Sequence, residues 1–522
     1  MTRGLRRGRS TLVGAAVLCL LVGPAHAAGT RDVVVSPSSP VTKDVLAEVD
    51  AYLARNREEH GWPGLAAAIV ADGEVAWSAG YGSTGPDGDP VTAQTPFLLA
   101  SVGKSLTALA VMRRVDAGEV GLDDPLTEHL PELLPGGAGL TVADLMFQHS
   151  GLGYRADNTV VLSDEDAGLS DQATAYESML REGAGFAYSN ANYDLLALLV
   201  ERSSGEPFED YLQGEVFGPL DMSTATTDPE VAEQAGLATG HYHWLGLGYR
   251  PFVPPLPDYD VGAYRMFAGA EDLAHALVLH LSGGEYDGRR VLSAESLTVL
   301  QTGEPVGGSD QARYGGGLWI HPAGSDWMTG PSAAYRFLEH DGSALSYRSY
   351  IWLMPDLGLG MVLLANANDW SDESRLPQVG FNARQILLGE ELTPITSRSP
   401  LLVRWGKHIF ALLALAQLGL TLASIRPIAG TWHGRQPGRA GLGLIAGVLT
   451  TTLFTGYALA RLIPSVTQSP LRAVALAPDA RILVSALIAG LILGLVLMAA
   501  LVLGLVRGRW AQRPAATLGL RG

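Results

Sequence analysis

Cysteine is almost absent from this sequence of 522 residues. The single cysteine, Cys19, lies in an apolar run, Leu12–Val22, which four arginines precede and the small residues Ala25 and Ala27 follow. This order of features is typical of a secretory signal peptide, which we place at residues 1–28; a short uncleaved membrane anchor is the alternative. Once such a peptide is removed, the mature chain has no disulfide bond and no thiol chemistry.

Lysine is also scarce, since Lys43, Lys104 and Lys407 stand against 33 arginines. Residues 32–400 hold 52 of the 53 carboxylates and only 19 basic residues, which gives them a formal charge of −33. A surface of this charge repels nucleic acid and anionic lipid. We therefore expect no nucleic-acid partner, and the charge says nothing about the substrate.

Acidic residues almost disappear after residue 400, where Asp479 is the single one. Three long apolar runs lie there, at about 409–425, 442–460 and 482–506, and each is close to the length that spans a bilayer. A channel or transporter would need ionisable groups inside such runs, and they have none. We therefore interpret residues 401–522 as a membrane anchor of three helices in contact with lipid.

The charges that flank these runs predict the orientation of the tail. The loops expected inside carry slightly more basic residues than the loop expected outside. We expect a cell-membrane protein with an extracytoplasmic catalytic domain and a cytoplasmic C-terminus. Two Gly-x-x-x-Gly spacings, Gly443 with Gly447 and Gly490 with Gly494, allow the helices to pack closely.

The outer domain, which we place at residues 29–395, mixes helical and strand-like patterns. Helices are expected at 43–59, 103–116, 141–149, 191–203, 270–281 and 378–388, and strands at 65–71, 74–81, 335–340, 347–355 and 359–365. This order predicts an α+β domain, in which helices flank an antiparallel sheet that joins the N-terminal and C-terminal hairpins. Residues 241–263, rich in proline, glycine and aromatics, are expected to form a long irregular loop.

Several common catalytic motifs are missing. The chain has no Gly-x-Ser-x-Gly, no His-Glu-x-x-His and no phosphate-binding glycine loop. The spacing of His241 and His243 suits a metal ion, but no further cluster accompanies it, so we expect no metal and no cofactor. We expect His149 to be a structural hydrogen-bonding residue rather than a base.

Ser101-Val102-Gly103-Lys104 is a candidate nucleophile with its base. The spacing places Lys104 one helical turn after Ser101, beside its hydroxyl group. Arginine keeps its proton whereas a desolvated lysine can release it, so a lysine in a chain that otherwise uses arginine points to a base. The helix N-terminus would favour a developing oxyanion. Alternatively, Ser101 caps a helix and Lys104 is a surface cation.

Tyr188-Ser189-Asn190 is a second candidate motif. A tyrosine can relay protons, and the asparagine amide offers both a donor and an acceptor for Lys104 and a substrate amide. Taken alone, a turn that enters the next helix explains these residues equally well.

His340-Asp341-Gly342-Ser343 ends a strand-like run. An edge strand beside a nucleophile can pair with an extended substrate, and glycine permits close approach. The next backbone N–H can join that of Ser101 as an oxyanion hole. Taken alone, these residues are better explained as a polar junction between a strand and a turn.

In this order, the three motifs resemble the serine β-lactamase and penicillin-binding protein superfamily. They best match the branch of class C β-lactamases and D-Ala-D-Ala carboxypeptidases, which also contains esterases and peptidases. Further segments that look like family signatures are 97–107, 140–152, 186–192, 217–222 and 266–274. The resemblance covers about residues 44–390.

The resemblance implies hydrolysis through an acyl-enzyme. Ser101 would attack a carbonyl group while Lys104 and Tyr188 move its proton, and two backbone N–H groups would hold the oxyanion. Asn190 would orient the substrate, and His340 would face its carboxylate side. The residues assigned on this basis are Ser101, Lys104 and Tyr188 for catalysis, and Asn190, His340, Gly342 and Ser343 for substrate binding.

The third motif departs from the pattern of the β-lactamases in this branch, which usually carry lysine where this chain has His340. Asp341 adds a negative charge where threonine is frequent. Both changes disfavour a β-lactam substrate. We expect a membrane-tethered serine hydrolase acting on a cell-wall D-Ala peptide, a small ester or a peptide. The alternative is a weakly active or inactive module that binds a cell-wall ligand such as peptidoglycan, or signals through the tail.

Overall fold

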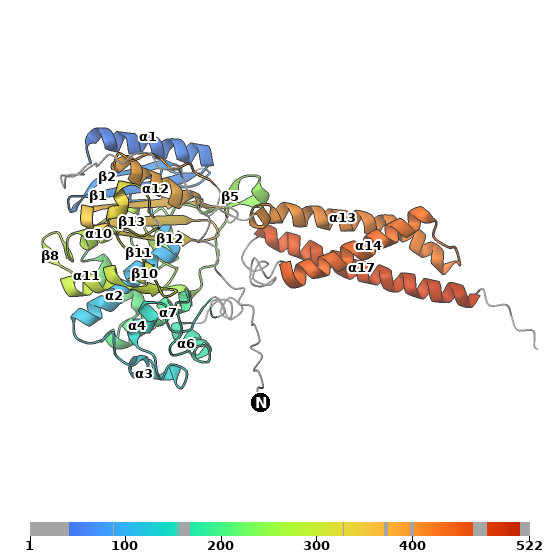
Figure 1. Ribbon diagram of the computed structural model, residues 1–522, viewed down its shortest axis with the longest axis horizontal. Coiled ribbons are helices and arrows are strands. Elements are labelled where there is room, and N and C mark those ends of the chain that lie inside the picture. Colours follow the sequence, from blue (N-terminus) through green and yellow to red (C-terminus); the bar gives the residue numbers. More distant parts are fainter. Residues whose placement is uncertain are drawn as a thin grey trace, which may run out of the picture. The chain divides into compact units, whose positions relative to one another are not determined.

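A computed structural model describes residues 41–86, 88–153, 156, 168–326, 328–369, 374–396, 401–462 and 478–511. The expected signal peptide at 1–28, with Cys19, lies outside these residues. The centre of the outer domain is an antiparallel sheet of eight strands in the order β2-β1-β14-β13-β12-β11-β10-β9 (Figure 1). Its strands are β1 (Gly64–Ala71), β2 (Glu74–Gly82), β9 (Glu304–Val306), β10 (Ser309–Gly315), β11 (Leu318–His321), β12 (Phe337–Ser343), β13 (Arg348–Met354) and β14 (Leu359–Ala365).

The sheet joins the two ends of the domain, as expected from the sequence. Asp72 and Gly73, at φ 53° and 79°, form the tight turn between β1 and β2. On its other side β1 pairs with β14, with Ala67 opposite Leu363. The predicted α+β class with an antiparallel sheet is therefore confirmed.

Both faces of the sheet are covered, because alternate side chains of β1 enter two separate cores. The odd-numbered residues from Leu65 to Ile69 join the core under α1 (Lys43–His60) and α12 (Arg375–Leu387). The even-numbered residues from Ala66 to Val70 join the core that contains α10 (Ala270–Leu281). Figure 1 shows α1 and α12 on one side of the sheet and most other helices of the domain on the opposite side.

The helices on that opposite side hold two of the three candidate motifs. α2 (Gly103–Asp116) begins two residues after Ser101. α7 (Asn190–Ser204) begins with Asn190, and Gly205, whose φ is 77°, caps its C-terminus. The other helices are α3 (Leu126–His129), α4 (Val142–Met146), α6 (Leu169–Glu177), α8 (Phe208–Leu212), α9 (Pro229–Gln234) and α11 (Ala294–Thr302). The short strands outside the main sheet are β3 (Phe97–Leu98), β4 (His241–His243), β5 (Tyr249–Pro251), β6 (Phe267–Ala268), β7 (Glu285–Tyr286), β8 (Arg289–Arg290) and β15 (Ala367–Asn368).

Two local predictions are wrong in extent. The helix expected at 141–149 ends at Met146, because Gln148 adopts a positive φ of 65° that breaks the helical path. The segment 241–263 is not wholly irregular, since β4 and β5 form a hairpin and β15 pairs with β4.

The tail contains three long helices, α13 (Leu401–Trp432), α14 (Arg439–Tyr457) and α17 (Pro478–Ala511). Each is long and apolar enough to cross a membrane, over 405–432, 439–461 and 478–507. The apolar runs identified in the sequence lie inside these spans.

Candidate active site

Ser101 lies in a short 3₁₀ turn, η1 (Ala100–Val102), between β3 and α2. The turn is held from two directions, since the N–H of Leu99 donates to Met266 O at 2.8 Å and the hydroxyl of Ser349 donates to Leu99 O. Ala100 adopts a φ of 48°, a left-handed conformation that is unfavourable for a residue with a Cβ atom. Such strain is found mostly where the surrounding structure enforces it at a functional site.

Lys104 is completely buried beside Ser101. Its Nζ donates three hydrogen bonds, to Ser101 Oγ at 3.1 Å, Asn190 Oδ1 at 2.8 Å and the backbone oxygen of Ala263 at 2.8 Å. Three acceptors satisfy all three donors of an ammonium group. The alternative of Lys104 as a surface cation is therefore wrong.

Aromatic rings surround this lysine. Nζ of Lys104 lies 5.1 Å from the centre of the Tyr188 ring and 5.9 Å from that of Tyr193. The Tyr188 ring is also 6.0 Å from the rings of Tyr314 and His340. Tyr188 therefore links the lysine to β12.

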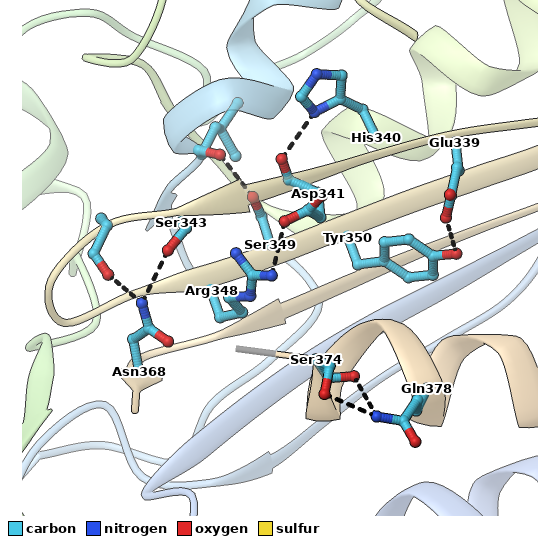
Figure 2. Close-up of polar contacts among 12 residues, drawn as sticks. Glu339, His340, Asp341, Ser343, Arg348, Ser349, Tyr350, Asn368, Ser374 and Gln378 are labelled. Atoms are coloured by element: carbon cyan, nitrogen blue, oxygen red, sulfur yellow. Dashed lines mark hydrogen bonds and ion pairs between the residues drawn. The ribbon is translucent and has the colours of Figure 1, made fainter. Parts of the chain in front are cut away.

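Gly342 brings β12 against the turn that carries Ser101. A Cβ atom at Gly342 would overlap Ser349 Oγ and Leu99 O, and would press on Ala100. Only glycine allows this approach. At the next residue, Ser343 Oγ accepts a hydrogen bond of 3.1 Å from Asn368 Nδ2, which Figure 2 shows at the end of the strand.

β12 is not the edge strand that the sequence suggested, because it lies between β11 and β13. Its pairing with β11 covers only Phe337–Glu339, whereas its pairing with β13 runs to Ser343. Within the described residues, the segment 340–343 therefore has no strand on its β11 side. It forms a local edge next to Ser101.

His340 is buried and neutral. Its Nδ1 lies 2.7 Å from Asp341 O, and a carbonyl oxygen only accepts, so Nδ1 carries the hydrogen (Figure 2). Nε2 is left to accept a long hydrogen bond, 3.4 Å, from the hydroxyl of Tyr314. Burial lowers the pKa of His340 to about 4, although the negative charge of Asp341 acts in the opposite direction.

The charge of Asp341 is compensated, contrary to what the sequence suggested. An oxygen of its carboxylate lies 2.6 Å from a guanidinium nitrogen of Arg348, a buried residue of β13 (Figure 2). Burial is the largest single influence and opposes ionisation of Asp341, but the charge of Arg348, the electrostatic interaction with His340 and the hydrogen bonds to the carboxylate together outweigh it, and the pKa of Asp341 is lowered. The substrate side of β12 therefore carries less negative charge than expected.

The structure brings all the candidate residues into one site, namely Ser101, Lys104, Tyr188, Asn190, His340, Gly342 and Ser343. It also adds residues that no sequence motif indicated. Tyr314 of β10 is buried among Tyr188, His340 and Trp319, with ring centres 5.3 to 6.0 Å away. The glycines that follow it, 315–317, are the one signal that marks its surroundings in the sequence.

The structural hydrogen bonds that we expected of His149 are made by its neighbour Gln148. Gln148 is buried, and its Oε1 accepts hydrogen bonds from the N–H of Ser189, at 2.9 Å, and from Asn192 Nδ2. Gln148 thereby ties the segment that follows α4 to the start of α7. The His149 ring packs edge-on against Phe186 instead.

The Nδ1 atoms of His241 and His243 contact different groups. His241 Nδ1 contacts Asn366 O at 3.1 Å, whereas His243 Nδ1 contacts Asp369 Oδ2 at 2.8 Å. No group of three or more potential ligands occurs in the part of the chain that the structure describes.

Comparison with known proteins identifies the family of the chain. The family model described as Beta-lactamase matches residues 49–384. Protein flp of Staphylococcus aureus (strain MW2) is 25% identical over 336 residues, which cover 63% of this chain and 64% of flp. Penicillin-binding protein 4 of Amycolatopsis lactamdurans is 30% identical over 330 residues, covering 59% of this chain and 82% of that protein.

The fold is also found among solved structures. An octameric penicillin-binding protein homologue from Pyrococcus abyssi is similar with a TM-score of 0.57 and 24% identity, over 70% of this chain and 81% of its own. The match to flp leaves more than a third of that relative uncovered. The family model spans well over half of the chain and includes every candidate site residue, and the chain therefore belongs to the beta-lactamase family.

Proposed function

We propose that this chain is a membrane-tethered serine hydrolase that cleaves an amide or ester through an acyl-enzyme. The observation that carries the proposal is the 3.1 Å contact between Lys104 Nζ and Ser101 Oγ, made by a lysine with no exposure to solvent. Members of this family are generally serine hydrolases. Burial of a lysine favours its neutral form, which is the form able to take a proton.

Of the three groups that Lys104 Nζ contacts, only the hydroxyl group of Ser101 has a proton that it can give to the lysine. The oxygens of Asn190 and Ala263 can only accept, so they occupy two N–H bonds of the lysine in either protonation state. When the amine is neutral, its lone pair is left facing Ser101 Oγ. The hydroxyl proton of Ser101 would then pass to Lys104, directly or with the help of Tyr188, as Oγ bonds to the substrate carbonyl carbon.

The oxyanion that forms needs donors beside Ser101. The backbone N–H groups of Ser101 and Ser343 are our candidates, because Gly342 presses β12 against the turn before Ser101. Collapse of the tetrahedral intermediate would release an amine or alcohol, which takes up the proton. A water molecule would then cleave the ester at Ser101 and restore its hydroxyl group.

The local edge at 340–343 supports an extended substrate, which would pair with β12 on the side where its pairing with β11 stops at Glu339. Neutral His340 offers a substrate carboxylate neither a positive charge nor a hydrogen-bond donor, because its one N–H is directed to Asp341 O. A D-Ala peptide, a small ester or a peptide is thus favoured over a β-lactam. The apolar helices α13, α14 and α17 support membrane tethering. The basic residues that flank the apolar runs favour a catalytic domain outside the cell and a C-terminus in the cytoplasm.

Covalent labelling of the full chain in detergent tests the proposal. A fluorescent penicillin and an activated ester should both be tried, and the ester is expected to react faster. Ser101→Ala should abolish labelling. Ser105→Ala is a matched control in the same region, since its hydroxyl group donates to Val102 O rather than to a site residue, and it should still be labelled.

Equal labelling of Ser101→Ala and the wild type would refute the assignment of the nucleophile. Turnover of an acyl substrate that disappears in Lys104→Ala would exclude the non-catalytic binding module. If no acyl probe labels the chain and no turnover is found, that binding module becomes the better interpretation.

A further inference from the structure

The side-chain amide of Asn190 contacts a different charged group at each end. Its Oδ1 accepts a hydrogen bond from Lys104 Nζ at 2.8 Å, and its Nδ2 donates one to Asp260 Oδ1 at 3.3 Å. A carboxylate only accepts, and an ammonium group only donates. Both neighbours therefore favour the same orientation of the amide, with its oxygen towards Lys104.

Asp260 matters most when Lys104 is neutral. A neutral amine has a lone pair that accepts hydrogen bonds, so Lys104 alone no longer selects the oxygen of Asn190. A reversed amide would donate to this lone pair and draw it away from Ser101. Reversal would also bring the amide oxygen against the carboxylate of Asp260, and that repulsion opposes it.

The segment around Asp260 is fixed firmly in the domain. Its backbone oxygen accepts hydrogen bonds from the N–H groups of Tyr264, at 3.0 Å, and Arg265, at 2.8 Å. Next to this turn, Gly262 O accepts a hydrogen bond of 2.6 Å from the hydroxyl group of Thr107 in α2. A Cβ atom at Gly262 would overlap the backbone of α7. The segment therefore presents Asp260 and Ala263 O to the site as one unit.

We propose that Asp260 is a positioning residue of this site, which locks the Asn190 amide so that Lys104 Nζ keeps its remaining hydrogen-bonding position for Ser101 Oγ. The inference rests on the proposed hydrolase function. It also means that Nδ2 of Asn190, a donor that the sequence offered to Lys104 or to the substrate, is engaged by the protein itself. Asn190 then acts chiefly on Lys104.

Asp258 provides a matched control. It lies two residues away in the same 3₁₀ turn, η5 (Asp258–Asp260), and has the same side chain. Its carboxylate is 66% exposed and pairs with Arg265 at 2.9 Å, on the rim of the segment. Loss of this exposed charge should change the acylation rate by less than about fivefold.

The first experiment measures acylation of the full chain in detergent by an activated ester. Asp260→Asn should lower the maximal acylation rate on the order of 10- to 100-fold and leave KM nearly unchanged, because it disturbs the alignment of the proton acceptor. Asp258→Asn should behave like the wild type. Equal rates for the two variants would overturn the proposal.

A charge-conserving exchange separates positioning from a merely structural role. In the double variant Asn190→Asp with Asp260→Asn, the carboxylate at position 190 can accept hydrogen bonds at both of its oxygens. One would come from Lys104, and the other from the amide at position 260. The double variant should therefore acylate faster than Asp260→Asn alone. Its rate should rise at higher pH than that of the wild type, since the negative charge now lies closer to Lys104. An absence of rescue would contradict the proposal.

A second measurement needs no turnover. The chain has three lysines, so isotope-labelled lysine gives three side-chain signals, and Lys104→Arg identifies the one from Lys104. Asp260→Asn should shift the titration midpoint of Lys104 to lower pH, by about half a unit or more, whereas Asp258→Asn should not. The other titratable groups facing Lys104 are Tyr188, Tyr193 and His340, which stay unchanged.

The two measurements distinguish the possible failures. A Lys104 signal that depends on Asp260 in a chain that no probe acylates would refute the hydrolase function but keep the positioning contact. A Lys104 signal that ignores Asp260 would overturn the positioning role even in an active enzyme.

Discussion

The carboxylate of Asp341 lies 2.6 Å from the guanidinium group of Arg348, across the pairing of β12 with β13. Arg348→Gln should leave the charge of Asp341 uncompensated beside His340. We expect a loss of about 2 kcal/mol of stability, less than for a fully buried pair because Asp341 is 41% exposed. Thermal unfolding of the full chain in detergent measures this loss. The further change Asp341→Asn should restore much of it, and no restoration would contradict a charge effect.

His340→Lys should move the site towards β-lactams. It places a cation where a substrate carboxylate would lie, and the charge of Asp341 is already held by Arg348. A charged hydrogen bond contributes roughly 1.5 kcal/mol or more, so penicillin acylation should rise about tenfold relative to that of a neutral ester. The ratio of the two labelling rates measures the effect. His340→Gln, which adds no charge, should not raise the ratio.

Gly342→Ala should slow acylation on the order of 100-fold or more in a folded protein. The new methyl group would overlap Leu99 O and Ser349 Oγ, and would push β12 away from Ser101. Loss of an oxyanion donor costs on the order of 100-fold or more in rate. Gly185→Ala is the control, because Gly185 lies in the approach to Tyr188 with open space around it. Normal labelling of Gly342→Ala would argue against an oxyanion hole at this strand.

Two buried histidines predict how stability depends on pH. Burial lowers the pKa of both His280 and His340 to about 4, whereas an unfolded histidine titrates near 6.5. Between these values the unfolded chain binds more protons, so the folded state loses stability as pH falls from about 6.5 to 4. The contribution is complete above this window, and each histidine contributes at most about 3 kcal/mol.

His280→Gln isolates one of these contributions. Thermal unfolding of the full chain at pH 7.5, 5.5 and 4.5 should show a shallower loss in the variant than in the wild type. Carboxylates that titrate in the same range are common to both proteins and cancel in the comparison. Identical pH dependence would show that His280 is not kept neutral by folding.

Elements with a strong local signal were predictable from the sequence. The turn at Asp72 and Gly73 specifies the β1–β2 hairpin, and the expected helix 103–116 has the bounds of α2. By contrast, β10 was missed because its sequence, SDQARYG, is polar and shows no strand alternation. It is a strand because β9 and β11 pair with it, which depends on the tertiary structure.

The residues of the candidate site also fall into those that a local sequence pattern predicts and those that only the tertiary structure brings together. Ser101 and Lys104 were predictable because one helical turn relates them and lysine is rare in the chain. Asp260 and Ala263 lie in an irregular segment, which lacks the hydrophobic periodicity by which a helix or strand is predicted. Arg348 was missed as the partner of Asp341 because only the register of β12 and β13 brings their side chains together.

The tail offers a test of its own packing. Gln417 of α13 is buried, and its Nε2 donates to Thr452 Oγ1 of α14 at 3.2 Å and to Gly490 O of α17 at 2.9 Å. Thr455 donates to its Oε1. These groups are polar but not ionisable, which agrees with a packed anchor rather than an ion pathway. Hydrogen bonds between membrane helices of this kind contribute about 1 kcal/mol each.

The glycines of the two Gly-x-x-x-Gly spacings of the tail are not equally packed. A Cβ atom at Gly494 would overlap Thr452 Oγ1 and crowd Gln417, whereas one at Gly443 would meet nothing within 4 Å. Gly494→Leu should separate α17 from α13 and α14, and should make the tail sensitive to protease in detergent. Gly443→Leu, the same change in the other spacing, should leave the tail as resistant as in the wild type. Equal sensitivity of the two variants would mean that the three helices do not pack through the Gln417 contacts.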